Sequence, residues 1–273
     1  MRVEITPEIA VGGGAPLALI AGPCVIESAD HVLFLAKRIR EIAGSYIFKA
    51  SFDKANRSSI NAYRGPGLEH GVKILRGVRE LGIAVLTDIH ETWQAERAAE
   101  GADILQIPAF LCRQTDLLIA AGRTGRAVNI KKGQFIAPGD IRLAADKVAS
   151  TGNDRILLTE RGTSFGYHNL VVDMRGLAIM REFGWPVVFD ATHSVQLPGA
   201  AGAASGGEPR FIAPLARAAA AVGIDALFVE VHEAPERALS DGANALRLDR
   251  LGSLLAQVRA VDRAVKAHLQ AGA

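Results

Sequence analysis

The chain has 273 residues, 49% of them hydrophobic, and its 31 lysines and arginines nearly balance 29 aspartates and glutamates. This length suits one α/β barrel of about 250 residues or two ordinary domains. The near-neutral charge excludes a nucleic-acid-binding face, so any anion site must be local. No apolar run approaches the roughly 20 residues of a membrane span, and the N-terminus lacks signal-peptide features, which predicts a cytoplasmic protein without a membrane partner.

The two cysteines, Cys24 and Cys112, lie far apart in the sequence and in different contexts. A structural disulfide is not expected between them in a reducing compartment. Cys112 follows Phe110 and Leu111 and has only Arg113 as a local basic neighbour, so we interpret it as a packing residue.

Short apolar runs recur along the chain at residues 17–20, 46–48, 83–86, 104–107, 127–130, 156–158, 187–189 and 226–229. Segments with helical spacing lie between them. After the first run, Ser28 or Asp30 can cap a helix that Gly44 ends, and its apolar face holds Val32, Leu35, Ala36, Ile39, Ile42 and Ala43. Eight strand–helix repeats predict a parallel sheet closed into one (β/α)₈ (TIM) barrel domain over residues 1–273. A doubly wound open sheet is the alternative.

Two further segments have weaker patterns. Residues 3–5 and 9–11 flank Thr6 and Pro7, and they predict a small hairpin that closes the bottom of the barrel. The glycine-rich segment 199–207 follows the seventh run, and it is interpreted as a mobile lid or entry loop, with a plain flexible connector as the alternative.

Polar or ionisable residues follow every apolar run. They are Cys24, Lys49, Asp88 with His90, Gln106, Lys131 with Lys132, Glu160 with Arg161, Asp190 with His193, and Glu230 with His232. Catalytic residues of such barrels lie at the C-terminal ends of the strands. So many titratable groups on one rim would cost stability in a purely structural barrel, so we expect an active site there.

Basic side chains are frequent on this predicted rim, and residues 48–59 add a donor-rich loop. The basic set consists of Lys49, Lys54, Arg57, Lys131, Lys132 and Arg161. Such a set favours phosphorylated, carboxylated substrates. Ordinary surface charge in a solvated loop is the alternative for each residue taken alone.

A mixed thiolate, imidazole and carboxylate set, typical of divalent transition metals, could form from Cys24, His193, Glu230 and Asp241. No metal-ligand spacing motif supports it. Cys24 could equally be a buried core thiol, and His193 a hydrogen-bonded loop histidine. His90 and His232 are further candidates.

Several segments closely resemble the 3-deoxy-D-manno-octulosonate 8-phosphate synthase family, and the match runs essentially end to end. They are residues 48–59, 63–68, 106–111, 113–117, 129–132, 165–167, 169–174 and 190–193. The resemblance implies a (β/α)₈-barrel transferase, usually a cytoplasmic homotetramer, that condenses phosphoenolpyruvate with arabinose 5-phosphate and water and releases phosphate. That reaction belongs to the biosynthesis of the inner-core sugar of lipopolysaccharide.

The sister family, 3-deoxy-D-arabino-heptulosonate 7-phosphate synthase, uses erythrose 4-phosphate. It carries Lys-Pro-Arg-Thr where this chain has Lys54-Ala55-Asn56-Arg57. The loop therefore separates the two families. The sister activity remains the first alternative.

The resemblance also implies residue roles. Phosphoenolpyruvate would be held by Lys49, Lys54, Gln106, Lys131 and Arg161, and the aldose phosphate by Asn56, Arg57 and Ser58, with Phe110 and Arg113 reaching in from a neighbouring subunit. Catalytic roles fall to Lys49, Lys54, Asn56, His193 and Asp241. Cysteine at the first strand end is typical of the metal-dependent branch, so Cys24, His193, Glu230 and Asp241 would bind one divalent ion of zinc, iron, manganese or cobalt. Residues 240–244 follow the family's pattern only loosely.

Two other classes of function stay open. A Schiff-base sugar-phosphate aldolase could use Lys49 or Lys131, since both stand at predicted strand ends. A non-catalytic sugar-phosphate sensor is the other, but it gives no reason for a thiolate, an imidazole and carboxylates to converge.

Overall fold

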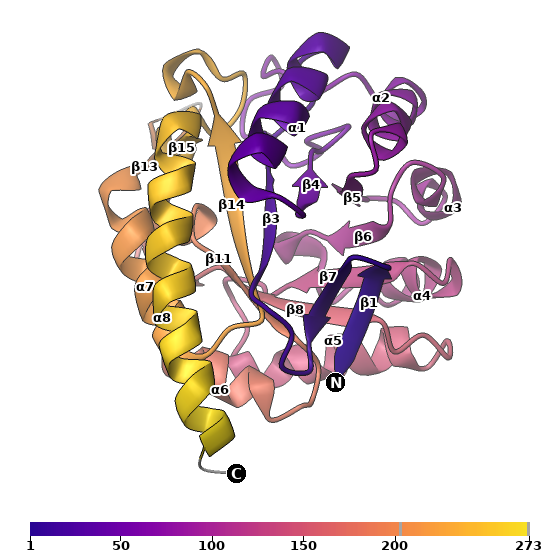
Figure 1. Cartoon of the computed structure of the whole chain (residues 1–273). Helices are drawn as coiled ribbons and strands as arrows, with labels where there is room; N and C mark the ends of the chain where they lie inside the picture. Colours follow the sequence, from indigo (N-terminus) through magenta and orange to yellow (C-terminus); the bar gives the residue numbers. More distant parts are fainter. Residues whose placement is uncertain (202–203, 272–273) are drawn as a thin grey trace.

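The computed structural model describes residues 1–201 and 204–271, and a closed barrel of eight parallel strands forms its centre (Figure 1). The strands are β3 (Ala18–Gly22), β4 (Ile47–Lys49), β5 (Ala84–Asp88), β6 (Ile104–Ile107), β7 (Ala127–Lys131), β8 (Ile156–Glu160), β11 (Val187–Asp190) and β14 (Ala226–His232). Each pairs in parallel with its sequence neighbour, and β14 closes the ring by pairing with both β11 and β3. The barrel prediction is confirmed, and the open-sheet alternative is wrong.

Helices surround this barrel, as Figure 1 shows. They are α1 (Ala29–Ala43), α2 (Leu68–Glu80), α3 (Gln94–Ala99), α4 (Thr115–Arg123), α5 (Ile141–Ala149), α6 (Arg175–Arg181), α7 (Ile212–Val222) and α8 (Leu251–Ala271). The ends of α1 follow the predicted signals: Ser28 Oγ accepts a hydrogen bond from the His31 N–H at 3.1 Å, and Gly44 ends the helix with φ of 76°. No helix within the described residues is long and apolar enough to cross a membrane.

Strands β1 (Arg2–Thr6) and β2 (Ile9–Gly12) form the predicted antiparallel hairpin. Its buried side chains Val3, Ile5 and Val11 pack against inward-facing residues from the first halves of the barrel strands, such as Ile20 and Ile47. The hairpin therefore fills the N-terminal end of the barrel, as the sequence predicted.

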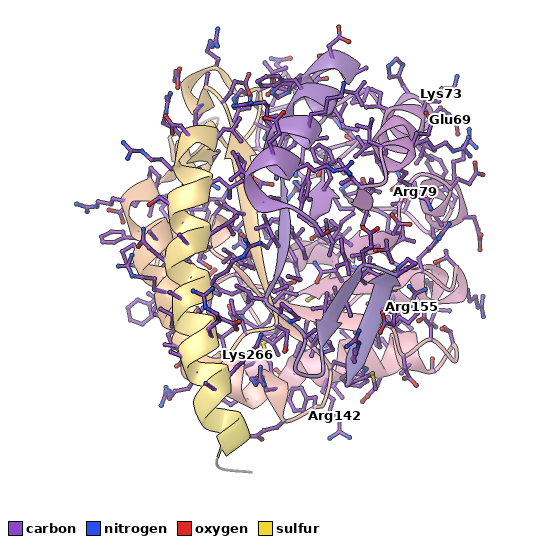
Figure 2. The ribbon with its side chains drawn as sticks, viewed as in Figure 1. Glu69, Lys73, Arg79, Arg142, Arg155 and Lys266 are labelled. Atoms are coloured by element: carbon purple, nitrogen blue, oxygen red, sulfur yellow. The ribbon has the colours of Figure 1, made fainter. Side chains whose placement is uncertain are left out.

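Two basic side chains fasten this end of the molecule, and Figure 2 labels both. Arg155 donates hydrogen bonds to the backbone oxygens of Gly125 and Glu4, at 2.9 and 2.8 Å. Lys266, on α8, donates to the oxygen of Ala15 at 2.9 Å. Closure at this end leaves the opposite, C-terminal end of the strands as the open mouth.

Shorter elements lie around this open end of the barrel. They are the pair β9 (Thr163–Ser164) and β10 (Leu170–Val171), the hairpin β12 (Gln196–Ala201) and β13 (Ala204–Gly207), and β15 (Leu246–Arg247) beside β14. Single 3₁₀ turns occupy 109–111, 138–140, 193–195, 209–211, 235–237, 242–244 and 248–250. Apart from residues 202 and 203, which lie outside the described residues, segment 199–207 belongs to the β12–β13 hairpin, which corrects the alternative of a plain connector. Its role as a lid stays a prediction.

The hairpin at the barrel bottom yields a stability prediction. Val11 is fully buried, so Val11→Ala should lower the free energy of unfolding by about 2 kcal/mol through lost apolar burial and a residual cavity. Val171, 46% exposed on β10, is the matched control, and Val171→Ala should change it by less than about 0.5 kcal/mol. Urea denaturation followed by circular dichroism measures both values. Equal effects would show that the hairpin contributes no core packing.

Candidate active site

A cavity of about 1040 Å³ opens at the C-terminal ends of the barrel strands. Its lining includes most of the residues that the sequence singled out: Lys49, Lys54, Asn56, Arg57, Ser58, Gln106, Phe110, Lys131, Arg161, His193, Glu230 and Asp241. Cys24 is buried directly behind Asp241. Arg113 is exposed and is not part of the lining, whereas Phe110 lines the cavity of its own chain.

Three predicted rim residues point elsewhere. Lys132 is buried among the oxygens of Gly133 and Thr163, at 3.2 and 3.0 Å, with the Glu160 carboxylate 3.6 Å away. Glu160 also accepts hydrogen bonds from the N–H groups of Arg161 and Gly162. The expectation that Lys132, Glu160 and His232 belong to the cavity rim was wrong, because neighbouring residues of a strand point to opposite sides. Lys131, Arg161 and Glu230 line the cavity from the same strand ends.

His232 is the third of these. Its Nδ1 accepts a hydrogen bond from the Ala234 N–H at 3.0 Å, and its ring lies 4.8 Å from that of His31. Two carboxylates lie equally close: Glu27 is 3.4 Å from His232 Nε2, and Glu233 is 3.4 Å from Nδ1. His232 thus belongs to a separate group between the end of β14 and the start of α1, and it is not a spare ligand for the cavity.

Lys49 and Glu230 form a buried ion pair in the cavity floor. Lys49 Nζ donates to Glu230 Oε1 at 2.6 Å and to the backbone oxygens of Cys24 and Pro23 at 2.7 and 3.3 Å. Burial raises the pKa of Glu230, but the cations Lys49, Lys54 and Lys131 together with His193 outweigh it and lower that pKa to about 2. With three oxygen acceptors around its Nζ, Lys49 is held in a fixed position.

Asp190 is a candidate functional residue to which the sequence analysis assigned no role. Its position at a strand end could have indicated one. The buried carboxylate accepts hydrogen bonds from Lys131 Nζ and from the backbone N–H groups of Thr192 and His193, and it lies 2.7 Å from His193 Nδ1. Burial raises its pKa, but His193 and Lys131 hold that pKa well below its usual range. Asp190 therefore orients both a lysine and an imidazole toward the cavity.

Lys131 and Arg161 supply positive charge from the next strands. Burial lowers the pKa of Lys131, although Asp190 and Glu230 oppose that effect, and its ammonium lies 4.1 Å from the centre of the Phe228 ring. Arg161 Nη2 donates to Gln196 Oε1 at 3.0 Å, while its buried Nη1 has no partner among the described residues. An unpartnered buried guanidinium nitrogen facing a cavity is suited to a ligand oxygen.

The loop after β4 brings further donors to the mouth. Arg57 donates from Nη1 to Ser240 Oγ at 2.8 Å and from Nη2 to the Leu239 oxygen at 3.0 Å, while Asn56 and Ser58 are exposed. Burial lowers the pKa of Lys54, but Cys24 and the nearby carboxylates outweigh it and raise that pKa well above its usual range. Lys54 therefore carries a full positive charge at the cavity.

Three of the four predicted metal ligands lie together: Cys24, Glu230 and Asp241 each offer a donor atom within 4.8 Å of the others. His193 lies beside this group, with Nε2 3.7 Å from Glu230 Oε1. Asp241 adopts φ of 51°, a left-handed conformation that is uncommon for residues other than glycine, although aspartate adopts it more often than most.

The donor set fits a divalent cation on two observations. Glu230 Oε2 is buried and has no hydrogen-bond partner among the described residues. Burial, followed by the charges of Asp241 and Glu230, raises the pKa of the Cys24 thiol, so these acidic groups oppose one another unless a cation stands between them. Thiolate, imidazole and carboxylate ligands together suit zinc, iron, manganese or cobalt.

Fold and site together define a (β/α)₈-barrel enzyme whose mouth gathers cations around a potential metal centre. The chain belongs to the DAHP synthetase I family, whose sequence model matches residues 1–267. It is 62% identical to the 2-dehydro-3-deoxyphosphooctonate aldolase of Syntrophotalea carbinolica, over 96% of this chain and 97% of that protein. Proteins of the same name from Citrifermentans bemidjiense and Geobacter sulfurreducens are 57% and 56% identical, each over 97% of this chain and 99% and 100% of the relative.

Asp88 lies in the cavity lining, where its carboxylate interacts with the charges of Lys54 and Lys49. Ser51 Oγ donates to its Oδ1, and His90 Nε2 lies 3.2 Å from its Oδ2. Burial raises the pKa of Asp88, but Lys54, His90 and Lys49 outweigh it and hold that pKa well below its usual range. The ionised carboxylate thus stabilises the folded chain.

This depressed pKa predicts a pH dependence of stability. A carboxylate with a lower pKa in the folded state contributes stability above its unfolded pKa of about 3.9, and that stability is lost as the pH falls toward the folded pKa. Asp88→Asn should therefore be less stable than wild type at pH 7, and the gap should narrow below about pH 4. Urea unfolding at both pH values tests this, with the exposed Asp154→Asn as control. A gap independent of pH would contradict the charge assignment.

Proposed function

We propose that this chain condenses phosphoenolpyruvate with D-arabinose 5-phosphate and water to give 3-deoxy-D-manno-octulosonate 8-phosphate and phosphate. The observation that carries the assignment is identity of 56–62% over nearly the whole chain to proteins named for 2-dehydro-3-deoxyphosphooctonate, a synonym of this product. The family description alone would suit the sister heptulosonate activity equally. The relatives' names favour the octulosonate reaction.

Phosphoenolpyruvate carries a phosphate and a carboxylate, and it would take the inner part of the cavity. Lys131 and Arg161 lie there with the amide of Gln106, whose Oε1 accepts from Asn129 Nδ2 at 3.0 Å and so leaves its own N–H groups for a ligand. Lys49 and Lys54 complete the cationic surroundings. Such fixed donors bind the anionic groups and hold C3 of the enol in place.

The aldose phosphate would enter from the side of the loop after β4. Asn56, Arg57 and Ser58 stand there at the cavity edge and offer amide, guanidinium and hydroxyl donors. Attack of C3 of phosphoenolpyruvate on the aldehyde carbon forms the new C–C bond, and positive charge builds at C2, where water adds. Phosphate then leaves by cleavage of its C–O bond. The residues act mainly by positioning the two phosphorylated substrates and compensating their charge.

A metal-dependent form of this chemistry fits the donor set of Cys24, Glu230 and Asp241, with His193 beside it as the fourth candidate ligand. A bound divalent ion would supply Lewis acidity for the aldehyde or acidify the water. Asp190 holds the Nδ1 side of His193, so that Nε2 faces Glu230. This is the usual support for a ligating imidazole.

The working species is proposed to be a cytoplasmic homotetramer with sites near subunit interfaces. The 55% exposed Phe110 and the exposed Arg113 are candidates for such an interface, beside the cavity. A Schiff-base aldolase is disfavoured, because Lys49 Nζ already donates to three oxygens and Lys131 Nζ is paired with the Asp190 carboxylate. Borohydride with substrate should accordingly trap no covalent adduct.

Substrate discrimination provides the direct test. Phosphate release from phosphoenolpyruvate should be fast with arabinose 5-phosphate and at least about 100-fold slower with erythrose 4-phosphate, because a site built for the longer sugar leaves polar groups unpaired with the shorter one. A coupled assay for phosphate measures both rates under identical conditions. Equal rates would assign the chain to the sister activity, and no release with either sugar would refute the proposal.

The metal proposal has its own test. Exhaustive chelation should abolish activity, and Zn²⁺, Fe²⁺, Mn²⁺ or Co²⁺ should restore it, while Cys24→Ala should lose both metal and turnover. Cys112→Ala is the matched control, since Cys112 is buried away from the cavity lining. Cys24→Asn should retain some metal-independent turnover if the ion chiefly holds groups in place. Full wild-type activity with no metal detected by elemental analysis would refute the assignment.

A further inference from the structure

A directed chain of hydrogen bonds runs from the loop after β4 to the candidate metal ligands. Arg57 Nη1 donates to Ser240 Oγ at 2.8 Å, Ser240 Oγ lies 2.9 Å from Cys24 Sγ, and the Cys24 thiol donates to Asp241 Oδ2 at 3.2 Å. Ser240 is only 4% exposed. One buried hydroxyl therefore stands between a guanidinium and a thiol.

The direction of each of these hydrogen bonds follows from which groups can donate and which can accept. A guanidinium can only donate, so the Ser240 oxygen accepts from Arg57 and its single hydrogen is left for the Cys24 sulfur. The thiol hydrogen in turn points to Asp241. If Cys24 loses that hydrogen, the Ser240 hydroxyl still donates to the resulting thiolate, and the Arg57 charge strengthens that bond.

The same contacts fix the orientation of Arg57. Both terminal nitrogens are engaged, Nη1 by Ser240 and Nη2 by the Leu239 oxygen, whereas the buried Nε has no partner among the described residues. Leu239 is held in turn by its N–H, which donates to Glu27 Oε1 at 2.9 Å. The guanidinium is thus held against residues 239 and 240, with free hydrogens available to an anion.

We propose that Ser240 is a positioning residue that couples the sugar-phosphate loop to the candidate metal ligands; this deepens the proposed function and rests on it. Ser240 holds Arg57 for the phosphate of the aldose, and the same hydroxyl adjusts the electron density on the Cys24 sulfur. An anion bound by Arg57 offsets the positive charge of the guanidinium that donates to Ser240 Oγ. Because such coupling is reciprocal, phosphate binding and the metal–sulfur bond influence each other.

Kinetics of Ser240→Ala test the positioning half of this inference. The variant should raise KM for arabinose 5-phosphate about tenfold, the usual effect of one lost bond to a charged group, and leave KM for phosphoenolpyruvate unchanged. Ser240→Thr, which keeps the hydroxyl, should restore the wild-type value, and the exposed Ser150→Ala serves as control. Equal rises in both KM values, or no rise, would overturn the positioning role.

Spectroscopy of the Co²⁺-loaded protein tests the coupling half without turnover. The thiolate-to-cobalt charge-transfer band should move to lower energy in Ser240→Ala, because a thiolate without its hydrogen bond gives up electron density more easily. Inorganic phosphate, added alone, should shift the band in wild type and in Ser240→Thr but not in Ser240→Ala. Identical shifts in wild type and Ser240→Ala would overturn the coupling.

Absence of a thiolate band in wild type would also overturn it. In that case, turnover of the substrate pair in the same sample would show that the proposed function stands without the coupling.

Discussion

The mouth of this barrel depends on one constraint, which is that charges buried there must be paired. Lys49 with Glu230 and Lys131 with Asp190 are ion pairs whose side chains are nearly excluded from solvent. Removing one member of such a pair leaves an uncompensated buried charge and costs about 3–5 kcal/mol. The two pairs therefore fix both lysines in space before any substrate arrives, and the donors around them take their positions from that arrangement.

The barrel carries these paired buried charges at one of its two ends only. The β1–β2 hairpin fills the N-terminal end with Val3, Ile5 and Val11, so that end contributes apolar packing. At the C-terminal end the strands deliver their polar residues around a cavity of about 1040 Å³. Stability and chemistry are thereby separated along the barrel axis, as expected of this fold.

Within the mouth, the neighbouring cations do not satisfy every acidic group. Glu230 keeps one oxygen unpartnered among the described residues, and Cys24 stands beside Asp241, whose backbone is held in a left-handed conformation. Strain and unsatisfied polar atoms are typical of functional sites. The segment that carries Asp241 is also the one on which Arg57 rests, so the proposed metal and sugar-phosphate regions share a support.

The sequence by itself determined the strand–helix repeat, the closing hairpin, the caps of α1 and the charged residues of the cavity that stand at strand ends, because these follow from local periodicity and from the rule that barrel chemistry lies at strand ends. The family resemblance added Asn56, Ser58 and Phe110, which also line the cavity. The sequence could not decide which strand-end side chains face the cavity. Lys132, Glu160 and His232 turn away from it, while Asp190 proved to orient two neighbours. The contact of Ser240 with Cys24 joins residues 216 positions apart. Only the tertiary structure reveals such choices, because side-chain direction and long-range pairing depend on the closed barrel and the packing of its loops.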